Sequence, residues 1–203
     1  MDFALLRDAF WGLTFDGIAL GAIYALISLG YTLVYGVLRL INFAHSEVFM
    51  IGTFAALVAA SGIMGVNVED DPRTGGSMIL TLLVCLLVAM LASAITAVLV
   101  EIVAYRRLRQ RGATKLATLI SAIGVSISLV ELFRILTDSL PREFPRIMEK
   151  TFLFRYAGAD IRNDKVIVII AAGLMMFALE RFITKSRLGK GISAVSMDES
   201  TST

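Results

Sequence analysis

The sequence predicts an all-α polytopic membrane protein with about five transmembrane helices, and three observations lead to this fold class. Hydrophobic residues make up 57% of the 203 residues, and the mean hydropathy is +0.80. Residues 17–38, 48–68 and 74–100 contain no charge, and each stretch meets the roughly 20 residues needed to cross about 30 Å of hydrocarbon. The stretches are continuously apolar, whereas barrel strands alternate apolar and polar side chains.

The first three predicted spans cover about residues 15–38, 47–66 and 77–104, one for each charge-free stretch. A proline inside a helix removes a hydrogen bond and clashes with the preceding turn. The three prolines of the chain all fall between predicted spans, at Pro72, Pro141 and Pro145. Their positions agree with these boundaries.

The last two predicted spans cover about residues 115–137 and 165–185. Their charge-free runs are shorter and reach a membrane-spanning length only when the flanking residues are included. Glu131 and Arg134 are three residues apart, so they share one helix face; we interpret them as an ion pair or as side chains that snorkel to the interface, rather than as a transport site. The segment between the two spans, residues 138–164, is expected to hold a short hairpin or an interfacial helix.

Lysine and arginine orient the chain, because cytoplasmic segments of membrane proteins carry an excess of both. Residues 101–115 hold five cations against one acid, and the end of the fifth span together with the tail after it holds four more cations, at Arg181, Lys185, Arg187 and Lys190. Residues 67–76 are acidic. The topology that fits these charges places residues 101–115 and the C-terminal tail in the cytoplasm. The N-terminus and residues 67–76 and 138–164 then lie on the external side of the membrane. Residues 1–185 then form the transmembrane domain, and residues 186–203 form a cytoplasmic segment.

Small residues recur at every fourth position in several spans. Gly52, Ala56 and Ala60 form one such row, and Ala89, Ser93 and Ala97 form another. Rows of this kind let two helix backbones approach closely where lipid supplies no hydrophobic drive. We interpret them as ordinary bundle packing.

A polar cluster follows the first span in the stretch "GVLRLINFAHSEVFMIG", residues 36–52. It contains Asn42, Glu47 and His45, which is the single histidine of the chain. One interpretation is that Asn42 or Ser46 caps the second span, while the Glu47 charge favours the positive helix end. The other is that Asn42, His45, Glu47 and the nearby Phe49 line a substrate path, since polar groups at membrane depth avoid lipid.

Several kinds of chemistry are not supported by the sequence. The nearest approach to a phosphate-binding loop, "RLGKGIS", lacks the leading glycine and the serine or threonine after its lysine. Metal binding by His45 and Glu47 would need more ligands than the neighbourhood shows, and a lone histidine does not indicate haem. His45 would also be the only imidazole base for a serine nucleophile. With a net charge of +2, nucleic acid is not indicated. We expect no metal, no cofactor and no enzymatic activity.

The long block "GLTFDGIALGAIYALISLGYTLVYGVLRLINFAHSEVFMIGTF" resembles the opening of the inner-membrane permeases of branched-chain amino acid ABC importers, the LivH type. "EIVAYRRLR" and "LATLISAIGVSISL" resemble the next two landmarks of that family, in the same order. "SRLGKGISAVSMDES" is similar to the start of the cytoplasmic loop that docks on the ATPase subunit. The resemblance covers nearly all of residues 12–200.

This resemblance implies a permease subunit in the bacterial inner membrane, with the predicted helices as the N-terminal part of a larger bundle. It implies a sister permease, two ATP-binding subunits and a periplasmic or extracellular substrate-binding protein as partners. Gly189, Gly191, Ala194 and Asp198 would belong to the ATPase-docking segment. Ser202 stands where the family has alanine, and about three further helices are expected, so we interpret the chain as a fragment or truncated product.

Two alternatives to an amino acid permease stay open at the level of sequence. Permeases for urea or short amides look similar in the first block, and no residue of the chain fixes the substrate. A membrane scaffold without transport activity, or a truncated remnant, belongs to a different class. Neighbouring genes for two ATPases, a second permease and a binding protein would favour the importer.

Overall fold

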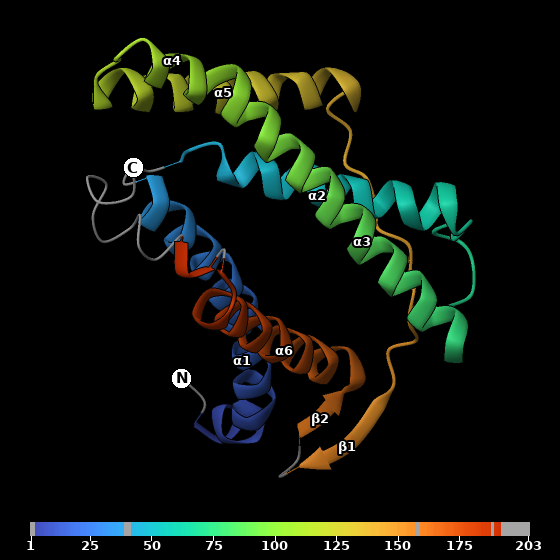
Figure 1. The fold of residues 1–203 in the computed structure, drawn as a ribbon. Coiled ribbons are helices and arrows are strands. Elements are labelled where there is room, and N and C mark those ends of the chain that lie inside the picture. The colour runs from blue at the N-terminus through green and yellow to red at the C-terminus, as the bar shows by residue number, and fades with distance from the viewer. Residues whose placement is uncertain (1–2, 39–41, 157–158, 188, 192–203) are drawn as a thin grey trace. The chain divides into compact units, whose positions relative to one another are not determined.

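The computed structural model describes residues 3–38, 42–156, 159–187 and 189–191 (Figure 1). Within these ranges, five helices are long and apolar enough to cross a membrane. This confirms the all-α polytopic fold class, and each predicted span overlaps one of the five helices. They cover Phe10–Gly36, His45–Ile63, Gly75–Gln110, Leu116–Leu136 and Asn163–Lys185.

The chain forms two compact units. The terminal unit consists of residues 1–39 and 150–203, and the central unit consists of residues 40–149. This grouping joins the first and last helices in one unit and the three middle helices in the other. The boundary expected near residue 185 and the assignment of the cytoplasmic face stay predictions.

The terminal unit packs α1 (Phe3–Leu38) alongside α6 (Asn163–Lys185) (Figure 1). An antiparallel hairpin of β1 (Phe152–Tyr156) and β2 (Ala159–Arg162) leads into α6, with Tyr156 opposite Ala159. Strand β2 also contacts α1. The hairpin is one of the two alternatives expected for the segment before the fifth span.

An ion pair between the Asp16 carboxylate and the Lys165 ammonium group joins α1 to the first turn of α6. Asp16 lies early in the span of α1, and Lys165 lies at the start of α6. The two helices therefore begin at the same end of the terminal unit. A pair at the edge of the hydrocarbon avoids the cost of an isolated charge at membrane depth.

In the central unit, α2 (His45–Val58) packs along α3 (Gly75–Val100) (Figure 1). Both helices continue as π-helices, α2 into η1 (Ala59–Ile63) and α3 into η2 (Glu101–Arg106). The short helix α4 (Arg107–Gln110) follows η2. Helix α5 (Lys115–Leu136) then packs against α2 and η2, and its N-cap Thr114 accepts a hydrogen bond from the Ala117 amide at 3.3 Å.

The contact between α2 and α3 is close because glycine occupies its centre. A Cβ atom added to Gly52 would collide with the Ser93 hydroxyl and would lie 3.4 Å from the Ala89 carbonyl oxygen. That hydroxyl donates to the Val48 carbonyl oxygen at 3.2 Å. Two of the small-residue rows seen in the sequence therefore meet here, as their interpretation as packing faces predicts.

Two small apolar cores flank this contact. One lies at the start of α2 and consists of Ala44, Val100, Ala104, Tyr105 and Ala122. The other lies near the end of α2 and consists of Ala59, Ala60, Cys85 and Ile147. Small side chains dominate both cores, which is the composition that close helix packing in lipid requires.

Hydrogen bonds show which chain segments share an end of the central unit. The Tyr105 hydroxyl donates to the Asn42 side chain, so the turn before α2 lies beside η2. At the opposite end, the Arg73 amide donates to the Ile147 carbonyl oxygen at 3.0 Å, and the Arg73 guanidinium donates to the Met64 carbonyl oxygen. These pairings agree with a topology in which residues 39–46 and 101–115 share one face of the membrane.

We predict that the end containing η2 is cytoplasmic, because it carries the arginine cluster. In a Cys85→Ser background, a cysteine at Asp71 should react with an impermeant maleimide added to intact cells, and one at Gln110 should not. Permeabilised cells provide the control, since both positions should then react. Labelling at position 110 in intact cells would contradict the orientation.

We predict that Gly52→Ala destabilises the helix pair by about 1–3 kcal/mol, the usual cost of overpacking. Adding Ser93→Ala removes the colliding hydroxyl and should restore most of that loss. Gly124→Ala is the matched control, because a Cβ atom there meets nothing within 4 Å. Thermal unfolding in detergent measures the three variants, and equal behaviour of Gly52→Ala and Gly124→Ala would refute the packing argument.

Candidate substrate-path and docking sites

The polar cluster of the sequence lies where the chain turns into α2. Asn42 is half-buried, and its Oδ1 atom accepts hydrogen bonds from the Tyr105 hydroxyl at 2.7 Å and from the Ala44 amide at 3.1 Å. The Asn42 carbonyl oxygen accepts from the His45 amide at 3.2 Å. Asparagine favours such turns because its short side chain bonds to the backbone two residues ahead.

Helix α2 begins without a side-chain cap of its own. Its N-cap residue is Ala44, which has no hydrogen-bonding side chain. Ser46 does not act as the cap, because its hydroxyl donates to the neighbouring Glu47 carboxylate at 2.9 Å. Asn42 instead holds the turn that precedes the helix, so the capping interpretation applies in part to Asn42.

The four predicted path residues occupy different environments. Glu47 is 8% exposed and lies in the first turn of α2, where a negative charge suits the helix dipole. His45 is half-buried at the first position of the helix. Phe49 is 57% exposed. Because α2 begins at His45, Asn42 lies in the turn before the helix, and both Asn42 and Glu47 are more covered than Phe49.

Tyr105 is the member of this site that the sequence analysis missed. It lies in η2, is 6% exposed and reaches Asn42 across 63 residues of sequence. Its signal in the sequence is weak, since tyrosine just before arginines is typical of any membrane interface. The close pairing of α2 with α3 is what brings it to Asn42.

Next to Tyr105, η2 and α4 carry an ion pair between Glu101 and Arg109. The second carboxylate oxygen of Glu101 is buried without a hydrogen-bond partner among the described residues. Arg106, Arg107 and Arg111 are exposed. This end of α3 therefore presents net positive charge next to the polar cluster.

Within the described ranges, no group of three or more histidine, cysteine, aspartate or glutamate side chains is placed to hold a metal ion. His45 and Glu47 are two such side chains, and a structural zinc site takes four ligands. The arrangement at the start of α2 is a hydrogen-bonded turn with one buried carboxylate. It can exchange hydrogen bonds with a polar molecule or with water.

The predicted docking segment begins where α6 ends. Ser186 has extended backbone angles, and its hydroxyl accepts from the Gly189 amide at 2.8 Å, while its carbonyl oxygen accepts from the Lys190 amide at 3.0 Å. Ser186 is thus the cap of a new helical turn. Ala194 and Asp198 lie outside the described residues, and their role stays a prediction.

The two glycines of this turn differ. A Cβ atom on Gly189 would come closer to the carbonyl oxygens of Phe182 and Ile183 than real Cβ atoms do, so the turn folds tightly against the last turn of α6. A Cβ atom on Gly191 would meet nothing within 4 Å. Only Gly189 of the pair is required by the local structure.

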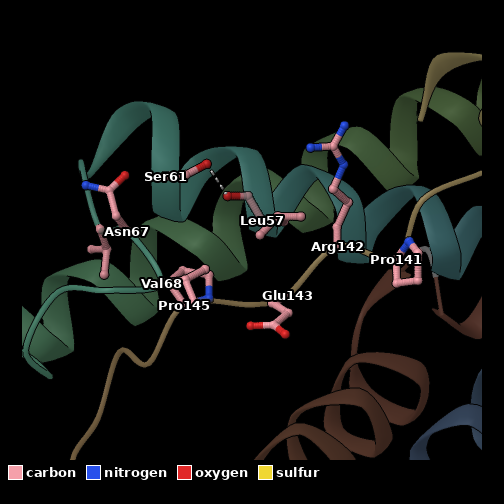
Figure 2. Close-up of a pocket in the computed structure, with 9 residues that line it drawn as sticks. Leu57, Ser61, Asn67, Val68, Pro141, Arg142, Glu143 and Pro145 are labelled. Atoms are coloured by element: carbon pink, nitrogen blue, oxygen red, sulfur yellow. Dashed lines mark hydrogen bonds between the residues drawn. The ribbon is translucent and has the colours of Figure 1, made fainter. Parts of the chain in front are cut away.

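A pocket of about 380 Å³ lies at the other end of the central unit (Figure 2). It contains none of the predicted path residues. Arg142 and Glu143 leave the loop in opposite directions in Figure 2, so they do not offer one ligand a paired charge. The lining residues are Leu57, Ser61, Val66, Asn67, Val68, Pro141, Arg142, Glu143 and Pro145.

Five apolar helices and a polar cluster at a helix end define a multi-pass α-helical membrane protein. The chain belongs to the family described as branched-chain amino acid transport system / permease component, whose model matches residues 13–203. This confirms the resemblance found in the sequence.

Curated relatives agree with the family. The chain is 34% identical over 186 residues to the high-affinity branched-chain amino acid transport system permease protein BraD of Pseudomonas aeruginosa, covering 90% of this chain and 58% of that protein. It is 34% identical over 187 residues to LivH of Escherichia coli, covering 91% and 58%. For LivH of Salmonella typhimurium the identity is 33% over 189 residues, with the same coverage.

The chain therefore spans 58% of the length of these curated relatives. No solved structure matches it.

We predict that Gly189→Ala opens the turn after α6, because the added methyl group collides with backbone atoms that have little freedom to move. Trypsin should then cleave faster after Arg187 and Lys190 in the detergent-solubilised chain. Gly191→Ala is the matched control and should leave cleavage unchanged, since its methyl group enters open space. Equal cleavage of both variants would show that Gly189 is not required.

Proposed function

We propose that the chain is a permease subunit of an ATP-driven importer for branched-chain, hydrophobic amino acids in the bacterial inner (plasma) membrane. The observation that carries the proposal is the family match across residues 13–203. The relatives named above are permease proteins for these substrates, and the five apolar helices suit the same role. The chain itself performs no chemical reaction.

The proposal includes partners, because a permease of this class neither captures substrate nor hydrolyses ATP by itself. A sister permease would complete the translocation path, and two ATP-binding subunits would supply the energy. A periplasmic or extracellular binding protein would deliver the amino acid. The sequence supports this division of labour, since it lacks a complete phosphate-binding loop.

The ATP-binding subunits would dock on residues 186–203. Support comes from the capped turn at Ser186 and from the close contact of Gly189 with the end of α6. A helical segment held tightly against α6 can pass a displacement on to that helix, whereas a solvated tail cannot. Ala194 and Asp198 are proposed as contact positions on this segment.

The inner mouth of the path would lie at the start of α2. A branched-chain amino acid carries an ammonium group, a carboxylate and an apolar side chain. Glu47 supplies negative charge, Asn42 and His45 supply hydrogen-bonding groups, and the exposed Phe49 supplies an apolar surface. Polar side chains inside membrane segments usually serve such pathways, because facing lipid is costly.

We expect Asn42→Ala and His45→Ala each to lower leucine uptake by the complete importer by about fivefold, the effect of losing one net hydrogen bond of about 1 kcal/mol. Asn67→Ala, at the opposite end of the central unit, is the matched control and should transport normally. Uptake of radiolabelled leucine into proteoliposomes, at equal amounts of assembled transporter, provides the measurement.

Two outcomes would count against the proposal. Normal uptake by Asn42→Ala and His45→Ala, together with lowered thermal stability, would make the cluster structural and place the path elsewhere. Uptake of urea in preference to leucine by the unmodified importer would overturn the substrate class.

A further inference from the structure

Tyr105 is buried in a way that its local sequence does not require. It lies in the stretch "EIVAYRRLR", followed directly by exposed arginines, yet only 6% of its surface is exposed. Its ring packs in the core that contains Ala44, which is fully buried, and Ala122. Its hydroxyl is placed 2.7 Å from Asn42 Oδ1.

The π-helix η2 sets the direction of Tyr105. A π-helical turn contains more residues than an α-helical turn, so every side chain that follows it is rotated relative to a continuous α-helix. Tyr105 lies near the end of this turn, after Glu101 has begun it. Continuing α3 as a regular helix would therefore aim the Tyr105 ring away from Asn42.

The hydrogen bond between Tyr105 and Asn42 acts on the turn that precedes α2. Asn42 Oδ1 serves the Tyr105 hydroxyl and the Ala44 amide together, while Ala44 itself offers no cap. Without the Tyr105 hydroxyl, Asn42 Oδ1 would keep the Ala44 amide as a donor but lose the hydrogen bond that ties it to η2, a net loss of about 1 kcal/mol. The Tyr105 hydroxyl thus holds the Asn42 side chain, and the Asn42 side chain holds the turn before α2.

We propose that Tyr105 is a positioning residue for the inner mouth of the substrate path. Through Asn42 it holds the turn at residues 42–44, and with it the direction in which α2 presents His45 and Glu47. This role rests on the proposed transport function. Tyr105 itself need not touch substrate, because its hydroxyl is already engaged by Asn42.

The first test is Tyr105→Phe in the complete importer, which removes the hydroxyl and keeps the ring in its core. We expect the KM for leucine uptake to rise by about fivefold, corresponding to about 1 kcal/mol of lost positioning, with the maximal rate nearly unchanged. Tyr24→Phe is the matched control, because Tyr24 is 60% exposed on α1, and it should behave as wild type.

The second test combines Tyr105→Phe with Asn42→Ala. If Tyr105 acts through Asn42, the double variant should have the same KM as Asn42→Ala alone. Independent roles would instead multiply the two effects. A double variant whose rise in KM equals the product of the two single rises would overturn the proposal, even if Tyr105→Phe alone were impaired.

The outcomes separate this inference from the proposed function. Normal KM for Tyr105→Phe, with impaired Asn42→Ala and His45→Ala, would refute positioning and leave the path in place. Normal uptake by all three variants would refute both the substrate path at this position and the positioning role of Tyr105. Lower thermal stability of Tyr105→Phe with unchanged KM per assembled transporter would show a purely structural contact.

Discussion

The close approach of α2 to α3 at Gly52 is the constraint on which the central unit depends. Apolar side chains gain little by leaving lipid for another apolar surface, so two membrane helices associate through close packing and hydrogen bonds. Gly52 supplies the space, and Ser93 supplies a hydrogen bond to the backbone of the facing helix. Both features operate at the same point, which fixes the separation and the register of the pair.

Register at this point decides what meets at the helix ends. Helices of this pair run in opposite directions, because Val48 near the start of α2 contacts Ser93 late in α3. From that contact, the chain before α2 necessarily reaches the residues that follow α3. Asn42 thereby meets Tyr105, and the polar cluster becomes a site built from two segments that are distant in sequence.

The sequence was sufficient to predict the helices and insufficient to predict the site. Charge-free runs identify the spans because hydrocarbon excludes charge over a fixed thickness, and this holds for each helix separately. The partner of Asn42 depends on two further features, the register set at Gly52 and the π-helical turn at η2. Neither feature can be recognised from residue composition, since "EIVAYR" would also suit a regular α-helix.

The docking segment shows the same division between what a pattern predicts and what geometry adds. Gly189 and Gly191 are equivalent in the sequence, as two small residues beside Lys190. Their surroundings differ, because only Gly189 lies against the carbonyl oxygens of the last turn of α6. Ser186 caps the helical turn that follows α6. The sequence alone does not mark it as a cap, since serine is common after any helix.

Much of the apolar surface of the chain has to be covered by lipid or by other protein. In the most apolar 18-residue stretch of each of α1, α5 and α6, 6% of the residues are buried inside the chain. The share is 22% in the span formed by α2 and η1. Large side chains on these helices, such as Ile135 on α5 and Leu174 and Phe177 on α6, are more than 60% exposed. These helices therefore owe little of their packing to this chain alone, and the bilayer or neighbouring subunits supply their environment.

If the proposed substrate path lies at the start of α2, the hydrogen bonds there would restrict how a substrate could bind. Asn42 Oδ1 already accepts from two donors, so it is not an acceptor for the ammonium group of an amino acid. The Glu47 carboxylate in the first turn of α2 is 8% exposed and receives a hydrogen bond from Ser46, so little of it is open to a ligand. The turn at residues 42–44 is held by Tyr105 and by the packing of Ala44, so the position of this turn and the position of η2 are linked.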